Sequence, residues 1–364
     1  MKAYRAAVIG CSRMGGFIDH EVIGMPGHTP PYSHGAGFFA CDRTDLVGCS
    51  DLRTDVMEEF GKLYEVPKDG HYTDYKELID QGELDIVSVA TQPEHRADIV
   101  IYAAEHGVKA IYAEKALSAS MEEADAIVSA VEANGAILNM GTNRRWHPGF
   151  DKMKEVIDSG ELGALRSVII YNNGTLFNTA SHTFDLAIRL NSDCPVAWAQ
   201  GQLPGGSGMF DGDILKEDPK AHGMFQFENG VTVYPMLTAA WSEYSVICEG
   251  GIMSALNNGI EWQLRKKVSI GPKGRSGLEE GTYPDFEEAS STLKLVEDLV
   301  HSLDTGEPPR GGVQIARANT ELIFAFIESE LRGGARVEMP LAGSRVRLQR
   351  DGAPKQPLIA PNEL

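Results

Sequence analysis

The sequence predicts an α/β protein of two domains. Its 364 residues exceed what one ordinary hydrophobic core needs and suffice for two. Across residues 1–142, short apolar runs alternate with segments of helical periodicity, which is typical of a parallel sheet with crossover helices. Across residues 143–364, apolar and polar residues alternate in short runs separated by turns, which predicts half-buried strands in a sheet with one free face.

The composition is that of a globular, soluble protein, with 42% hydrophobic and 23% charged residues. A net charge of -19 argues against nucleic acid and anionic membranes as partners. No C-x-x-C spacing suggests a metal site, and reduced thiols are expected for all five cysteines: Cys11, Cys41, Cys49, Cys194 and Cys248. No leader pattern and no apolar run near the ~20 residues of a membrane span occur, so a cytoplasmic protein is expected.

The first strand leads into a glycine-rich turn. The apolar run Ala6–Ile9 is followed by Gly-Cys-Ser-Arg-Met-Gly, which has the layout of the dinucleotide fingerprint G-x-G-x-x-G with serine in place of the middle glycine. Such a turn also occurs for packing alone. In the functional interpretation, the pyrophosphate of a dinucleotide is bound at Gly10, Ser12, Arg13, Met14 and Gly15.

Residues 24–35 are dense in proline and glycine and predict a loop, either a lid or a subunit contact. Its histidines, His28 and His34, are expected at the surface. The next strand ends at Asp51, a candidate for the ribose hydroxyls that favours NAD over NADP because a carboxylate repels the additional phosphate. Arg53 could instead bind that phosphate, and Asp51 could simply begin a turn.

The apolar strand 110–113 ends at Glu114 and Lys115, before a helix that begins at Ser118 or Ser120. Ligands of open α/β sheets lie at the carboxyl ends of the strands, so Lys115 is expected to face a cofactor or substrate. The alternative is a solvated charge pair.

A second chemical centre is expected in the helix 178–189, capped by Thr179 or Ser181. His182 and Asp185 share a face of this helix, as does Asn178 if the helix includes it. A lone histidine on such a helix is more often structural.

These motifs, together with the turns 91–95 and 143–145, Gly160-Glu-Leu-Gly163 and the tail 312–340, resemble in the same order the glucose-fructose oxidoreductase and inositol dehydrogenase family (Gfo/Idh/MocA). The resemblance implies a Rossmann dinucleotide-binding domain, residues 1–142. It also implies an α/β domain, residues 143–364, whose large, mostly antiparallel open sheet carries the substrate face and the contacts of a homo-oligomer.

The resemblance further implies an NAD-dependent dehydrogenase, with NADP as the less favoured cofactor, that oxidises a secondary hydroxyl of a sugar, cyclitol or derivative. His182 would act as the base and Lys115 would polarise the oxygen. Substrate or cofactor would be oriented by Asn178, Asp185, Arg144 and Arg145, and the cofactor would be lined by Thr91, His95 and Glu114.

Two positions depart from the family pattern. Ala116 stands where the family has proline after Glu-Lys, and Asn178 stands where its dehydrogenases often have aspartate. An amide cannot stabilise an imidazolium by charge. Either Asp185 or Glu114 would supply the missing negative charge, or the chemistry differs from the usual alcohol oxidation. The alternatives are a glycosidase of the same family, which recycles NAD through oxidation, elimination and reduction, and a non-catalytic nucleotide-binding sensor.

Overall fold

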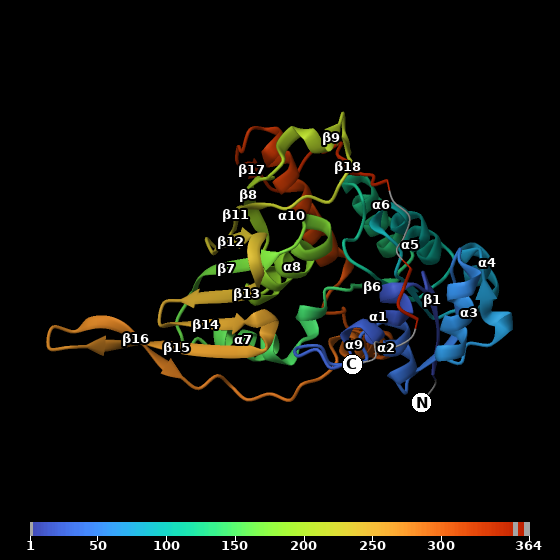
Figure 1. Cartoon of the computed structure of the whole chain (residues 1–364), viewed down its shortest axis with the longest axis horizontal. Helices are drawn as coiled ribbons and strands as arrows, with labels where there is room; N and C mark the ends of the chain where they lie inside the picture. Colours follow the sequence, from blue (N-terminus) through green and yellow to red (C-terminus); the bar gives the residue numbers. More distant parts are fainter. Residues whose placement is uncertain (1–2, 352–355, 360–364) are drawn as a thin grey trace. The chain divides into compact units, whose positions relative to one another are not determined.

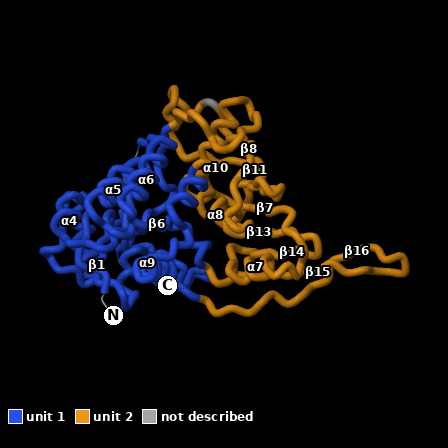
Figure 2. The backbone as a smooth tube through the Cα atoms, turned by 180° about the vertical axis from the view of Figure 1, so that it is seen from behind, with its two compact units in different colours: residues 1–146, 289–320, 347–364 blue, residues 147–288, 321–346 orange. Residues whose placement is uncertain are grey.

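The computed structural model describes residues 3–351 and 356–359. The chain divides into two compact units (Figure 2). The first comprises residues 1–146, 289–320 and 347–364, and the second comprises residues 147–288 and 321–346. The domain limits expected from the sequence, 1–142 and 143–364, stay a prediction.

The first unit is built on a parallel sheet. Within the described residues, six strands lie in the order β3-β2-β1-β4-β5-β6. In chain order, the strands are β1 (Tyr4–Ile9), β2 (Thr44–Ser50), β3 (His71–Tyr72), β4 (Ile86–Val89), β5 (Ala110–Ala113) and β6 (Ile137–Met140). The strand order reverses between β1 and β4, and a crevice for ligands forms at such a switch point, outside the carboxyl ends. The predicted α/β fold is confirmed.

Helices and helical turns connect these strands (Figure 1). They are η1 (Arg13–Phe17), α1 (Ile18–Val22), α2 (His34–Ala40), α3 (Thr54–Leu63), η2 (Lys68–Gly70), α4 (Tyr75–Gln81), η3 (Pro93–His95), α5 (Arg96–Glu105), α6 (Met121–Ala133) and η4 (Asn143–Trp146). Of the two serines expected to begin α6, Ser120 is the cap, because its hydroxyl accepts the backbone N–H of Glu123 at 3.2 Å.

A helix from late in the sequence completes the core of this unit. Helix α9 (Ser291–Thr305) begins after Ser290, whose hydroxyl accepts the backbone N–H of Leu293 at 2.9 Å. Its apolar face packs against the strands through buried Leu295, Val296, Leu299 and Val300. Burial on both faces explains why β4 and β5 read as continuous apolar runs rather than as alternating patterns. A short late strand, β18 (Arg347–Leu348), also belongs to this unit.

The second unit contains a large mixed sheet, mostly antiparallel as expected. Among the residues described there, nine strands follow the order β16-β15-β14-β13-β7-β12-β11-β8-β17, and only β7 and β12 pair in parallel. They are β7 (Leu165–Asn173), β8 (Val196–Gln202), β11 (His222–Phe227), β12 (Thr232–Met236), β13 (Thr238–Cys248), β14 (Gly251–Leu256), β15 (Glu261–Ile270), β16 (Arg275–Gly281) and β17 (Val337–Glu338).

The remaining elements of this unit are α7 (Pro148–Ser159), η5 (Leu176–Ala180), α8 (Ser181–Leu190), η6 (Gly206–Met209), the short hairpin of β9 (Phe210–Asp211) and β10 (Ile214–Leu215), η7 (Asn257–Gly259) and part of α10 (Val313–Leu331). The expected cap of the His182 helix is wrong. Helix α8 begins at Ser181 after Ala180, with no side-chain cap, because a π-helical turn precedes it and the Ser181 hydroxyl donates to the carbonyl of Phe177 at 2.9 Å.

All five cysteines are free thiols, four of them buried and Cys194 partly buried. No helix within residues 3–351 and 356–359 combines the length and apolar character needed to cross a membrane.

Candidate functional site

The glycine-rich turn after β1 has the geometry of a dinucleotide cradle. Gly10 has a φ of +89°, a conformation that side chains disfavour. A Cβ on Gly15 would lie 1.9 Å from the Gly10 carbonyl oxygen, so η1 can pack against the turn only with glycine there. Ser12 precedes η1, and its carbonyl accepts the backbone N–H of Gly16 at 2.8 Å. These residues fit a nucleotide pyrophosphate, which binds where a tight turn opens a helical segment.

Asp51 lies beside this turn, at the end of β2. Its Oδ2 accepts the backbone N–H of Cys11 at 2.8 Å and its Oδ1 accepts that of Arg53 at 2.9 Å. The carboxylate therefore ties the fingerprint turn to its own loop. The Arg53 guanidinium contacts Asp55 at 3.2 Å and also donates to Gln356, while Arg13 pairs with Glu21 at 2.7 Å.

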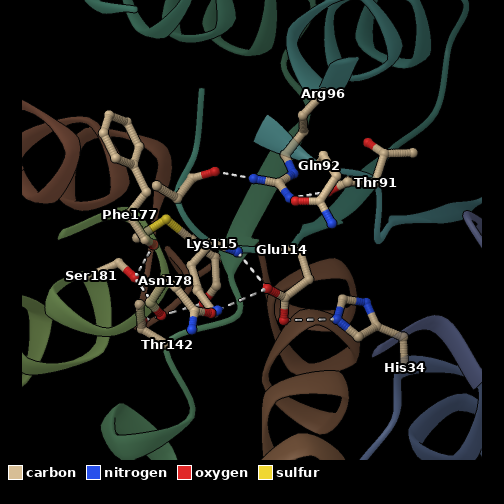
Figure 3. Close-up of polar contacts among 12 residues, drawn as sticks. His34, Thr91, Gln92, Arg96, Glu114, Lys115, Thr142, Phe177, Asn178 and Ser181 are labelled. Carbon is tan, nitrogen blue, oxygen red and sulfur yellow. Dashed lines mark hydrogen bonds and ion pairs between the residues drawn. The ribbon is translucent and has the colours of Figure 1, made fainter. Parts of the chain in front are cut away.

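Glu114 and Lys115 are not a solvated pair. They follow β5 directly, and the Glu114 and Lys115 side chains are only 5% and 12% exposed. The Glu114 backbone N–H donates to the carbonyl of Val89 in β4 at 2.9 Å, which extends the sheet to this point. Its Oε2 accepts the backbone N–H of Lys115 at 2.9 Å and lies 4.0 Å from the ammonium nitrogen (Figure 3). These contacts restrict the orientation of the Glu114 carboxylate at the edge formed by the carboxyl ends of the strands.

The surface position expected for His34 is wrong. Its side chain is fully buried, with Nδ1 2.6 Å from the Ser88 hydroxyl of β4. Its Nε2 lies 3.3 Å from Oε1 of Glu114 (Figure 3). The ring stacks on Tyr112 with 3.7 Å between centroids. The histidine thus lies in the interior, against the carboxylate that precedes Lys115.

The loop predicted over residues 24–35 ends two residues early. The Ser33 hydroxyl accepts the backbone N–H of Ala36 at 3.2 Å and caps helix α2, which begins at His34. This cap directs the first residue of the helix inward. The proline and glycine content of the segment predicted the loop but gave no sign of the helix start.

The environment fixes the charge of both partners. Burial raises the pKa of Glu114, but the Lys115 cation and the hydrogen bond from His34 outweigh it and lower the pKa to about 2. Burial lowers the pKa of His34 despite the neighbouring carboxylate. Glu114 is therefore an anion and His34 a neutral imidazole near pH 7. Because a carboxylate only accepts hydrogen bonds, Nε2 of His34 carries the proton and Nδ1 accepts from Ser88.

Arg96 was not identified from the sequence. It is the first residue of α5, is 1% exposed, and its guanidinium donates to the carbonyls of Thr91 and Ala116 (Figure 3). Burial lowers its pKa to about 10, so it remains a cation at neutral pH. It joins the turn after β4 to the bend after Lys115, where the Lys115–Ala116 peptide bond is cis. No local sequence pattern indicates these carbonyl partners.

The two turns expected to line the site differ in exposure. In the turn after β4, Thr91 is half-buried and His95 is exposed. In η4, Arg144 is half-buried, whereas Arg145 is fully buried and donates to the carbonyl of Arg310 at 3.0 Å. The Arg145 side chain therefore stabilises the interior of the first unit, whatever contact with substrate its neighbour makes.

In the second unit, the predicted centre lies at the start of α8. His182 is half-buried, Asp185 is 1% exposed, and Asn178 is exposed in the π-helical turn η5. Asp218, which the sequence did not single out, accepts the backbone N–H groups of Phe177 and Asn178 at 2.9 and 3.0 Å. It thereby holds the turn that carries Asn178. The convergence of His182 and Lys115 stays a prediction.

Known proteins resemble the chain in sequence and in fold. Residues 4–142 match the family described as "Oxidoreductase family, NAD-binding Rossmann fold" (GFO_IDH_MocA). Myo-inositol 2-dehydrogenase of Thermotoga maritima is 28% identical over 168 residues, which cover 42% of this chain and 49% of the relative. The scyllo-inositol 2-dehydrogenase (NAD(+)) of Bacillus subtilis is 37% identical over 162 residues, which cover 44% of this chain and 41% of the relative. The chain thus spans about half the length of these relatives.

A solved structure extends the likeness in fold to nearly the whole chain. The inositol dehydrogenase homolog of Azotobacter vinelandii, complexed with NADH and myo-inositol, superposes with a TM-score of 0.72 at 17% identity, covering 93% of this chain and 98% of that one. The matched residues 4–142 hold the glycine-rich turn, Asp51 and the Glu114-Lys115 pair described above. This segment of the chain therefore matches the Gfo/Idh/MocA family of oxidoreductases in sequence.

Proposed function

We propose that the protein is an NAD-dependent dehydrogenase that oxidises a secondary hydroxyl of a sugar, cyclitol or related polyol. The observation that carries the proposal is the buried Glu114-Lys115 pair, which follows β5 in a parallel sheet whose first turn fits a dinucleotide. A charged amine at the carboxyl ends of the strands in such a sheet lies where ligands bind. The likeness of part of the chain to inositol dehydrogenases supports the substrate class in this proposal.

In this proposal, Lys115 and His182 divide the work on the substrate hydroxyl. A bound nicotinamide dinucleotide supplies the hydride acceptor. The His182 imidazole, whose ordinary pKa lies near neutrality, takes the hydroxyl proton. The Lys115 ammonium stabilises the negative charge that develops on the oxygen. Asn178, Asp185 and Arg144 orient the substrate.

The preference for NAD over NADP rests on Asp51. Its carboxylate lies at the end of β2 and is fixed by the backbone N–H groups of Cys11 and Arg53. A fixed anion there would accept hydrogen bonds from ribose hydroxyls and repel an additional phosphate. Arg53, the group that could bind that phosphate, already contacts Asp55.

The test is a screen of inositols, monosaccharides and glycosides, each with NAD and NADP in parallel, read by the absorbance of reduced cofactor. We expect NADH to accumulate with NAD and at least one polyol, and NADPH to accumulate more slowly when NADP replaces NAD. No reduced cofactor with any compound would contradict it.

Asn178 favours one second candidate, a glycosidase that oxidises its sugar, eliminates the aglycone and returns the hydride. The amide at this position lacks the charge of the aspartate that related dehydrogenases often carry. Aryl glycosides distinguish the two activities, since the glycosidase releases the aryl group without accumulating NADH.

We also propose a homo-oligomer that forms through the second unit's sheet. Tyr234 and Met236 alternate on β12 and are 43% and 42% exposed, and Trp241 of β13 is 52% exposed. Large apolar side chains this exposed on a sheet are typical of protein contacts. Sedimentation of the wild type and of Trp241→Ser tests this, and an unchanged monomer in both would contradict it.

A further inference from the structure

Several contacts fix the end of the segment 24–35 and the start of α2, which place the His34 imidazole beside Glu114. Asp19 accepts the backbone N–H groups of Tyr32 and Ser33 at 2.6 and 2.8 Å, and Thr292 of α9 donates to the Tyr32 carbonyl at 2.9 Å. These contacts hold the chain immediately before His34. Asp19 and Thr292 therefore both fix the backbone that positions the His34 side chain.

His34 bridges two neighbouring strands at the edge where ligands are expected. On one side it accepts from the Ser88 hydroxyl of β4, and on the other it donates to Glu114 after β5. Tyr112, parallel to the ring within 11°, fixes the plane of the imidazole. A neutral ring with both nitrogens hydrogen-bonded and one face stacked has a single orientation, so it can hold a carboxylate in place.

We propose that His34 is a positioning residue, which fixes the Glu114 carboxylate and through it the backbone and ammonium group of Lys115. This inference rests on the proposed function, because it assigns His34 to the reaction of Lys115. The two oxygens of Glu114 have separate partners: Oε1 faces His34, and Oε2 accepts the backbone N–H of Lys115 at 2.9 Å. Rotation of the carboxylate would break both contacts together.

Two substitutions separate the two hydrogen bonds of the ring. The oxygen of His34→Asn can replace Nδ1 toward Ser88 but its amide does not reach Glu114, whereas the longer His34→Gln can replace Nε2 toward Glu114. His71→Asn is the matched control, since His71 is a half-buried histidine whose Nε2 contacts the Val66 carbonyl at 3.2 Å.

The experiment measures kcat and KM of the full chain with NAD and the polyol identified by the screen. His34→Asn is expected to lower kcat roughly 10-fold to 100-fold, which corresponds to a lost hydrogen bond to a charged group. The kcat values of His34→Gln and His71→Asn should stay within about 3-fold of the wild-type value, because both variants keep the hydrogen bond to Glu114. Equal kcat values for His34→Asn and the wild type would overturn the proposal.

A double-mutant cycle distinguishes positioning from a structural role. If His34 acts through Glu114, adding His34→Asn to Glu114→Gln lowers kcat no further, although the melting temperature can still fall. Fully additive losses in kcat would overturn the proposal.

A readout without turnover separates this inference from the proposed function. Imidazole ¹⁵N spectra, with the His34 signals assigned by their loss in His34→Asn, should show a neutral ring protonated at Nε2 and shifted by Glu114→Gln. That spectrum in a protein inactive toward every polyol would support the His34–Glu114 contact while the proposed function fails. A ring protonated at Nδ1 alone would overturn the contact.

Discussion

Nε2 of His34 lies 3.3 Å from Oε1 of Glu114, although 80 positions separate the two residues in the chain. The contact joins the start of α2 to the end of β5, and both side chains are buried. It places a neutral hydrogen-bond donor behind the carboxylate that precedes Lys115.

Removing either proposed catalytic group should abolish most turnover. Lys115→Ala and His182→Ala are each expected to lower kcat by roughly 100-fold to 10,000-fold, the range for loss of a charge-stabilising group or of a positioned base. Binding of NAD, measured by calorimetry, should survive in both. Lys109→Ala is the control, because its ammonium pairs with Asp85 at 2.6 Å. Near-normal turnover in both active-site variants would refute these assignments.

Acid should remove the stabilisation that Glu114 provides. Its pKa is about 2 in the folded protein against an ordinary value of 4.5, so its contribution is complete above pH 4.5 and is lost as the pH falls toward 2. A shift of this size corresponds to on the order of 3 kcal/mol. The difference in unfolding free energy between the wild type and Glu114→Gln, measured in urea, should therefore shrink from about pH 6 to about pH 3. A difference independent of pH would contradict this.

Gly15→Ala should disrupt the nucleotide cradle. The added Cβ would lie 1.9 Å from the Gly10 carbonyl oxygen, so η1 must move away from the turn. Overpacking of this kind costs about 1–3 kcal/mol, and we expect NAD affinity to fall at least about 10-fold. Gly208→Ala is the control, since no described residue beyond its two chain neighbours lies within 4 Å of its added Cβ. Unchanged stability and NAD affinity in Gly15→Ala would contradict the close packing of η1 against the Gly10 turn.

Arg96→Lys should weaken the link between the Thr91 turn and the bend after Lys115. A lysine keeps the charge but cannot reach two carbonyls with one planar group. We expect a loss of about 1–3 kcal/mol in unfolding free energy, the cost of a buried carbonyl without its donor. Arg43→Lys, at the exposed pair with Asp304, should cost less when measured in the same urea titration. Equal losses at the two sites would contradict the role of Arg96.

Sequence patterns predicted the parts of this protein that depend on local chemistry. The strand before Gly10, the acid at Asp51 and the Glu114-Lys115 pair all follow from apolar runs that end in polar residues. His34 and Arg96 could not be predicted in the same way. Glu114 lies 80 positions from His34, and Ala116 lies 20 positions from Arg96. A buried imidazole also carries no periodic signal among prolines and glycines.

The start of α8 shows a second limit. Thr179 and Ser181 have the side chains that usually cap helices, yet neither does so here. Asp218, about 40 positions away, accepts the backbone N–H groups of the preceding turn instead. A tertiary contact replaced the local one, and a capping rule based on neighbouring residues has no means to detect it.

The most direct test of the proposed roles of Lys115 and His182 is a crystal structure of the protein with NAD and the polyol that it oxidises. We expect Nζ of Lys115 and a ring nitrogen of His182 to lie within about 2.6–3.2 Å of one substrate oxygen, beside the nicotinamide ring. Either group more than roughly 6 Å from that oxygen, beyond the reach of a direct or water-bridged proton transfer, would contradict it.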